Sequence, residues 1–254
     1  MERKIDRRLT YKKYKRKLNS ILFLLIIPAV VMLGAFLVLY LNDIISMTHL
    51  GTIYMPLMIT YLILVFIMTP NLYYYKMYAN YSKLLLNKPK FLESSSQLFT
   101  SSWIDQLKSD GYNLVQEDMR HILLCKYYKK LSNSSQSDQT LVFIAIAKNR
   151  EFDFYGDEID NGIQAFYMKH KNYEKISKRI TLQFKKYDII DEKATAEVET
   201  AILYQAGKQI IINLTFAYCN DKGSLFGLYP EKWYPNRYTH FAFTECKRIC
   251  DIKE

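Results

Sequence analysis

Glycine is scarce in this sequence, which has eight glycines among 254 residues. None of them has the spacing of a P-loop or of the dinucleotide-binding fingerprint, in which glycines let backbone N–H groups approach a phosphate. The sequence therefore offers no glycine-rich loop for a nucleotide, and no cofactor is expected.

Cysteine is scarce as well, and the cysteine spacing does not favour a metal site. Cys246 and Cys250, with His240 nearby, supply three ligand side chains, but zinc sites usually show tighter paired spacings. His121 and Cys125 stand four residues apart, which on a strand leaves them distant neighbours rather than a catalytic dyad. We expect ordinary thiols and no metal or catalytic residue.

Acidic clusters are the remaining candidates for a metal or acid/base site. They comprise Asp157, Glu158, Asp160, Glu197 and Glu199. Charges at helix starts and at alternate strand positions are usually solvated, and that interpretation is favoured here. An enzyme is thus the least favoured class of function.

Two stretches contain no ionisable side chain other than tyrosine. Residues 20–41 include fifteen Leu, Ile, Val or Phe, and residues 53–75 form a second apolar run. As helices they would measure about 33 and 34 Å, against about 30 Å for the hydrocarbon core of a bilayer. The first run is too long for a signal peptide and lacks its cleavage site. The sequence predicts two transmembrane helices.

Basic residues are distributed unevenly around these runs. Residues 1–18 hold nine Lys or Arg, the connecting residues 42–52 hold none, and residues 76–90 hold four. Positive residues resist translocation, so both termini are expected in the cytoplasm of a multi-pass cell-membrane protein. The predicted segments are a basic stretch 1–19, a span 20–41, a loop 42–52, a span 53–75, a basic connector 76–90 and a domain 91–254.

The formal net charge of +10 comes from these membrane-flanking segments, because residues 91–254 hold 22 basic and 22 acidic residues. This distribution favours anionic lipid headgroups over nucleic acid as the electrostatic partner. The alternative, that the charges only set topology, is equally open. The predicted lipid contacts are Arg3, Lys4, Arg7, Arg8, Lys12, Lys13, Lys15, Arg16 and Lys17.

The domain is predicted to be α+β with a mainly antiparallel sheet and two or three helices. Helical spacing predicts helices over about 96–110 and 157–177. Residues 191–205 fit either a helix or the first strand of a hairpin with 209–219. The other predicted strands are 113–116, 119–128, a fully buried 140–147, a short one near 152–155, a half-exposed 179–187 and 238–243.

An aromatic segment, residues 226–238, is the predicted recognition loop. Its large side chains, Tyr229, Trp233, Tyr234 and Tyr238, lie near two prolines that stiffen the backbone. The alternative is an aromatic cover over one side of the sheet. The expected function is a binding, scaffold or regulatory module for a protein or small ligand at the inner membrane face. A ligand-sensing effector that assembles its spans as a homo-oligomer is the alternative.

Overall fold

The computed structural model describes residues 2–42, 47–94, 97–131 and 138–252. The chain forms two compact units, Met1–Lys83 and Leu84–Glu254.

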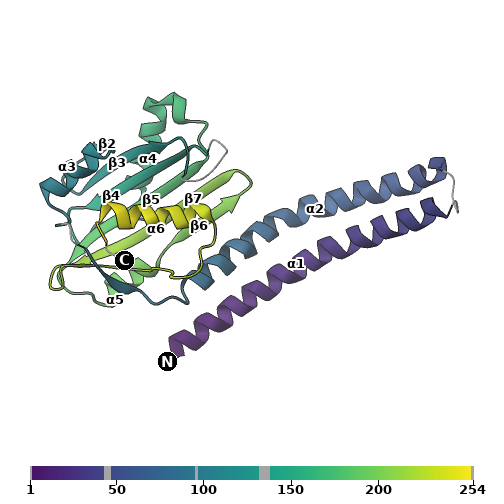
Figure 1. The fold of residues 1–254 in the computed structure, drawn as a ribbon, viewed down its shortest axis with the longest axis horizontal. Helices are drawn as coiled ribbons and strands as arrows, with labels where there is room; N and C mark the ends of the chain where they lie inside the picture. The colour runs from purple at the N-terminus through teal and green to yellow at the C-terminus, as the bar shows by residue number, and fades with distance from the viewer. Residues whose placement is uncertain (1, 43–46, 95–96, 132–137, 253–254) are drawn as a thin grey trace. The chain divides into compact units, whose positions relative to one another are not determined.

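The first unit is a pair of long helices, α1 (Glu2–Leu41) and α2 (Met47–Leu84) (Figure 1). They run antiparallel, because Tyr61 donates a hydrogen bond to the carbonyl of Leu25 at 2.8 Å and the Tyr14 and Tyr78 rings stack at 5.1 Å. Both helices are long and apolar enough to cross a membrane by length and composition. The predicted basic stretch 1–19 is from Glu2 onward the first part of α1.

The second unit is built on one mixed sheet. Its strands are β1 (Lys90–Glu93), β2 (Asn113–Glu117), β3 (His121–Tyr128), β4 (Thr140–Ala147), β5 (Lys178–Tyr187), β6 (Ile202–Ala206), β7 (Gln209–Cys219) and β8 (Ser224–Gly227). Their order is β1-β8-β7-β5-β4-β3-β2, and β6 also pairs with β7.

The α+β class is confirmed, but the expected mainly antiparallel character is not. The central pairs β4–β5 and β5–β7 are parallel, whereas the outer pairs are antiparallel. Parallel neighbours need a crossover connection. Helix α4 (Asp157–Lys169) supplies the first, and α5 (Glu192–Glu199) together with β6 supplies the second.

Helices cover both faces of this sheet. Helices α3 (Ser101–Ser109) and α6 (Arg237–Ile249) share an apolar cluster with Ile180, Leu182 and Phe184 of β5. On the opposite face α4 packs with β3 and β4, and α5 packs with β7 and β8, in two separate apolar clusters. A short 3₁₀ helix, Lys171–Tyr173, follows α4.

Two strand predictions are wrong. Residues 238–243 lie in α6, whose first turn is capped by Asn236 through a 2.8 Å bond accepted from the Thr239 amide. Residues 152–155 form no strand, and Phe152 and Phe154 instead fill the cluster under α4. For residues 191–205 both alternatives hold in part, since α5 is followed by β6 and a hairpin into β7.

The prediction that residues 179–187 form a half-exposed strand is also wrong, although the strand exists. Because β5 lies between β4 and β7 and both faces of the sheet are covered, its second face is buried as well. Thr181, Gln183 and Lys185 are at most 1% exposed. These polar side chains of β5 therefore lie in the interior of the domain.

Candidate functional site

A row of polar side chains lies on the centre of the sheet, on the face that carries α4 and α5. Strand β5 contributes Thr181, Gln183 and Lys185, and β7 contributes Asn213 and Thr215. The parallel register places Thr181 beside Asn213 and Gln183 beside Thr215. All five side chains are buried. We call these residues the polar row.

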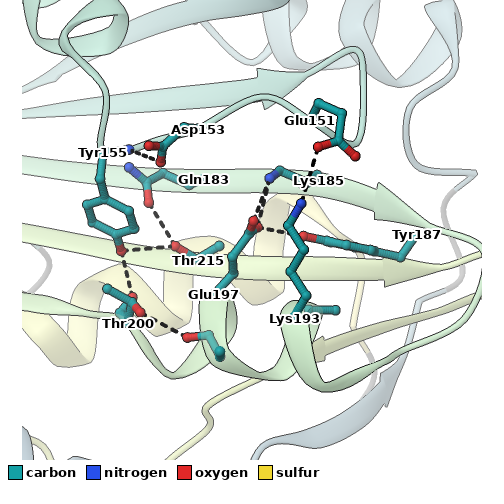
Figure 2. A network of polar contacts seen from close by, with 12 residues as sticks. Glu151, Asp153, Tyr155, Gln183, Lys185, Tyr187, Lys193, Glu197, Thr200 and Thr215 are labelled. Carbon is teal, nitrogen blue, oxygen red and sulfur yellow. Dashed lines mark hydrogen bonds and ion pairs between the residues drawn. The ribbon is translucent and has the colours of Figure 1, made fainter.

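One half of the polar row is linked by hydrogen bonds. Figure 2 shows Gln183, Thr215, Tyr155 and Thr200 joined in that order. The Thr215 hydroxyl donates to Gln183 Oε1 at 2.8 Å, and the Tyr155 hydroxyl lies 3.4 Å from Thr215 Oγ1. Tyr155 donates at 2.7 Å to the carbonyl of Thr200. Tyr155 thus connects the segment after β4 to the end of α5.

Other polar atoms of the row are buried and lack a partner. Within the described residues Thr181 Oγ1, Gln183 Nε2 and Asn213 Oδ1 are buried and form no hydrogen bond. An unsatisfied buried group costs about 1–3 kcal/mol. Three such atoms in one row of neighbouring strands call for an explanation.

A buried ion pair bounds the polar row at the carboxyl end of β5. Lys185, whose side chain is 1% exposed, lies 2.8 Å from Glu197 of α5, and Tyr187 donates to the same carboxylate at 2.5 Å (Figure 2). Burial, then the hydrogen bond and charge of Glu197, raises the pKa of the Tyr187 hydroxyl. Tyr187 therefore remains a donor throughout the physiological pH range.

Polar contacts also join the segment 148–156 to α5. Arg150 pairs with Asp191, the residue that caps α5, and Lys193 lies 3.3 Å from Glu151. With the Tyr155 contact, these pairs connect the two segments that flank the polar row. Such exposed pairs contribute little to stability, and the connection between the segments is correspondingly weak.

The predicted recognition residues lie against the opposite face of the sheet. Tyr229 and Tyr234 pack on Phe243 of α6, with ring centroids 5.4 and 5.9 Å away. Trp233 is half-buried, and Tyr238 is 5% exposed and donates to Asp138 at 2.6 Å. This packing is that of the aromatic cover held open as the alternative, and recognition by residues 226–238 stays a prediction.

The predicted lipid contacts lie on α1. The exposed ones are Arg8, Lys12, Lys13, Lys15, Arg16 and Lys17, and Arg7 is half-exposed. The side chains of Arg3 and Lys4 lie outside the described residues. Lys12, Lys13, Arg16 and Lys17 line one cleft with residues of α2.

The sequence of β5 contains a signal for the polar row, but the same signal also fits a half-exposed strand. The alternation of β5 fits a strand with one wet face as well as a central strand with a buried polar face. Glu197 was expected to be solvated, but it binds Lys185 and Tyr187. His240 is exposed while Cys246 and Cys250 are in the core, and no group of three metal-ligating side chains occurs among the described residues.

Comparisons of this chain with protein-family models, with curated proteins and with solved structures found no match.

Proposed function

We propose that this chain is a two-span membrane protein whose α+β domain binds a small polar ligand over the centre of its sheet, at the cytoplasmic face. The observation that supports this function is the polar row, where three neighbouring side chains hold buried atoms without partners. Natural proteins retain such destabilising groups mainly where function requires them.

The unpartnered atoms define the chemistry of the ligand. Asn213 Oδ1 accepts a hydrogen bond, Gln183 Nε2 donates one, and the Thr181 hydroxyl does either. A neutral group that combines a donor with an acceptor, such as an amide or a polyol, satisfies all three. Tyr155, which is 40% exposed, lies at the boundary of the row and is the residue that would move to admit the ligand.

The free energy of unfolding of two threonine variants, one at Thr181 and one at Thr215, tests this function. Thr181→Val should raise the free energy of unfolding by about 1 kcal/mol, because it removes an unpartnered hydroxyl, whereas Thr215→Val should lower it by about 1 kcal/mol, because it breaks a formed bond. Chemical denaturation of the full chain in detergent, followed by tryptophan fluorescence, measures both. Trp103 and Trp233 are the chain's two tryptophans, and both lie in the second unit.

A thermal-shift screen of the full chain against small amides, polyols and nucleosides completes the test. Compounds that stabilise the wild type should lose their effect in Asn213→Leu, which keeps the branching of the side chain and removes the acceptor. Loss of stability in Thr181→Val, or hits that are unaffected by Asn213→Leu, would assign the row a structural role instead.

The membrane location has its own prediction. The full chain should stay in vesicles after carbonate washing, because two apolar helices of sufficient length hold it there. A protease added outside sealed cells should leave the carboxyl-terminal domain intact, since the positive flanks place both ends inside. Release by carbonate, or digestion from outside, would contradict the insertion or the orientation respectively.

A further inference from the structure

The cleft between α1 and α2 has a cluster of cations that the ligand site does not use. It measures ≈ 750 Å³ and is lined by Lys12, Lys13, Arg16 and Lys17 of α1 and by Asn71 and Tyr75 of α2. The four cations recur at i, i+1, i+4 and i+5, so the helical period gathers them on the face turned toward α2.

Within the described part of the chain, none of these four cations has a carboxylate partner. Residues 1–83 contain three acidic residues, Glu2, Asp6 and Asp43. Like charges on neighbouring turns repel one another. A cluster of this kind is satisfied by an external anion.

The cleft also has groups suited to a phosphate. Lys17 Nζ lies 5.4 Å from the centroid of the Tyr75 ring, and the Tyr14 ring contacts Tyr75 and Tyr78 at 6.3 and 5.1 Å. These aromatic contacts fix the position of α1 against α2 where the cations gather. Asn71 adds an amide donor and Tyr75 a hydroxyl.

The depth of the cleft matches a lipid headgroup. The apolar run begins at Ser20, which also lines the cleft. At about 1.5 Å per residue, Arg16 and Lys17 lie about 4–6 Å beyond the hydrocarbon boundary and Lys12 about 12 Å beyond it. The polar layer of a leaflet is about 5–8 Å thick, so the cations extend through it and past it.

We propose that this cleft is a binding site for an anionic phospholipid whose headgroup carries two phosphates. The proposal rests on the membrane insertion proposed above. Arg16 and Lys17 contact the phosphate nearer the hydrocarbon, and Lys12 and Lys13 contact the second. Basic pockets between membrane helices on the cytoplasmic side are the known setting for such headgroups.

Two double variants with equal loss of charge test the site. Lys12→Gln with Arg16→Gln removes two cations from the cleft. Arg8→Gln with Lys15→Gln removes two predicted lipid contacts of the same helix that lie outside the cleft, where Lys15 packs over Tyr11. The probe is phosphatidylinositol 4-phosphate, because its two phosphates lie at different depths in the leaflet. In nanodiscs of neutral lipid supplemented with it, native mass spectrometry of the full chain should show lipid retention reduced roughly thirtyfold in the first variant and little changed in the second.

Three outcomes would overturn the proposal. Equal losses in the two variants would mean that binding follows net charge, and no loss in either would mean that the cleft holds no lipid. Displacement of the phosphatidylinositol 4-phosphate by free pyrophosphate would identify a soluble phosphate compound as the ligand. Carbonate washing of each variant separates these results from a failure of membrane insertion, since both should remain in the vesicle fraction.

Discussion

Replacing Glu197 with leucine should lower the free energy of unfolding of the domain by about 3–5 kcal/mol, the usual cost of leaving a buried charge without its partner. Lys185 is 1% exposed, and the carboxylate of Glu197 lies 2.8 Å from its ammonium group. The leucine side chain also leaves the Tyr187 hydroxyl without its acceptor. Tryptophan fluorescence during urea titration of the full chain in detergent measures the change.

The reverse substitution should cost less. In Lys185→Met the remaining charge, Glu197, is 24% exposed and keeps the hydrogen bond from Tyr187. The double variant Lys185→Met with Glu197→Leu should recover most of the loss, because an apolar pair of similar volume often replaces a buried ion pair without penalty.

A control on the same helix is Glu192→Leu, which changes an exposed residue of α5. It should leave stability nearly unchanged. If Glu197→Leu changed stability as little as this control, Lys185 would have another acceptor. The ion pair between Lys185 and Glu197 would then not bound the polar row.

Sequence patterns predicted the elements whose apolar residues fit a single environment. The run 140–147 is buried on both sides as expected, and the helix predicted over 96–110 exists with a later start at Ser101. Gly111, which follows that helix, adopts a φ of 91°. These features are local, because a continuous apolar run or a left-handed glycine has few alternative structures.

The errors arise where one pattern fits two environments. Residues 238–243 are rich in aromatic side chains, which are common in strands, but Tyr238, Ala242 and Phe243 also share one face of a helix. The Asn236 cap decides between the two structures, and a single capping residue is a weak signal.

The polar row was not predictable for a related reason. Thr181, Gln183 and Lys185 would be ordinary on an edge strand, and only the sheet order, which depends on contacts between distant segments, makes β5 central. Sequence did identify Glu197 as a candidate residue. It could not show that the partner of Glu197 would be a lysine twelve positions earlier in the chain.

Asp138→Asn should also destabilise the domain at neutral pH, by about 1.5–3 kcal/mol, because it removes a buried anion that accepts from two cations and a tyrosine hydroxyl, while both cations keep access to water. The Asp138 side chain is 2% exposed and pairs with Lys178 at the start of β5 and with Arg237 of α6, the latter at 2.7 Å. Tyr238 adds a hydrogen bond of 2.6 Å.

The same carboxylate should make the domain sensitive to acid. Burial by itself would raise the pKa of Asp138, but hydrogen bonds from Lys178 and Tyr238 and the charges of Lys178 and Arg237 outweigh it and hold the pKa below its ordinary value of 3.8. Glu245, bound by Arg248, Tyr112 and Tyr128, likewise has a pKa below its ordinary value of 4.5. A lowered folded-state pKa gives stability that is present above the unfolded-state value and is lost as the pH falls through the folded-state value.

Urea unfolding between neutral pH and pH 3 should therefore show stability falling from about pH 5 downward in the wild type. The slope should be smaller in Asp138→Asn, because one carboxylate with a lowered pKa no longer titrates. The matched control is Glu231→Gln, an exposed carboxylate whose pKa is also lowered, in this case by the hydrogen bond and charge of Lys90. It should leave neutral-pH stability nearly unchanged. An Asp138→Asn variant with the wild-type slope would show that folding does not lower the pKa of Asp138, and the acid sensitivity would then be assigned to other carboxylates with a lowered pKa, such as Glu245.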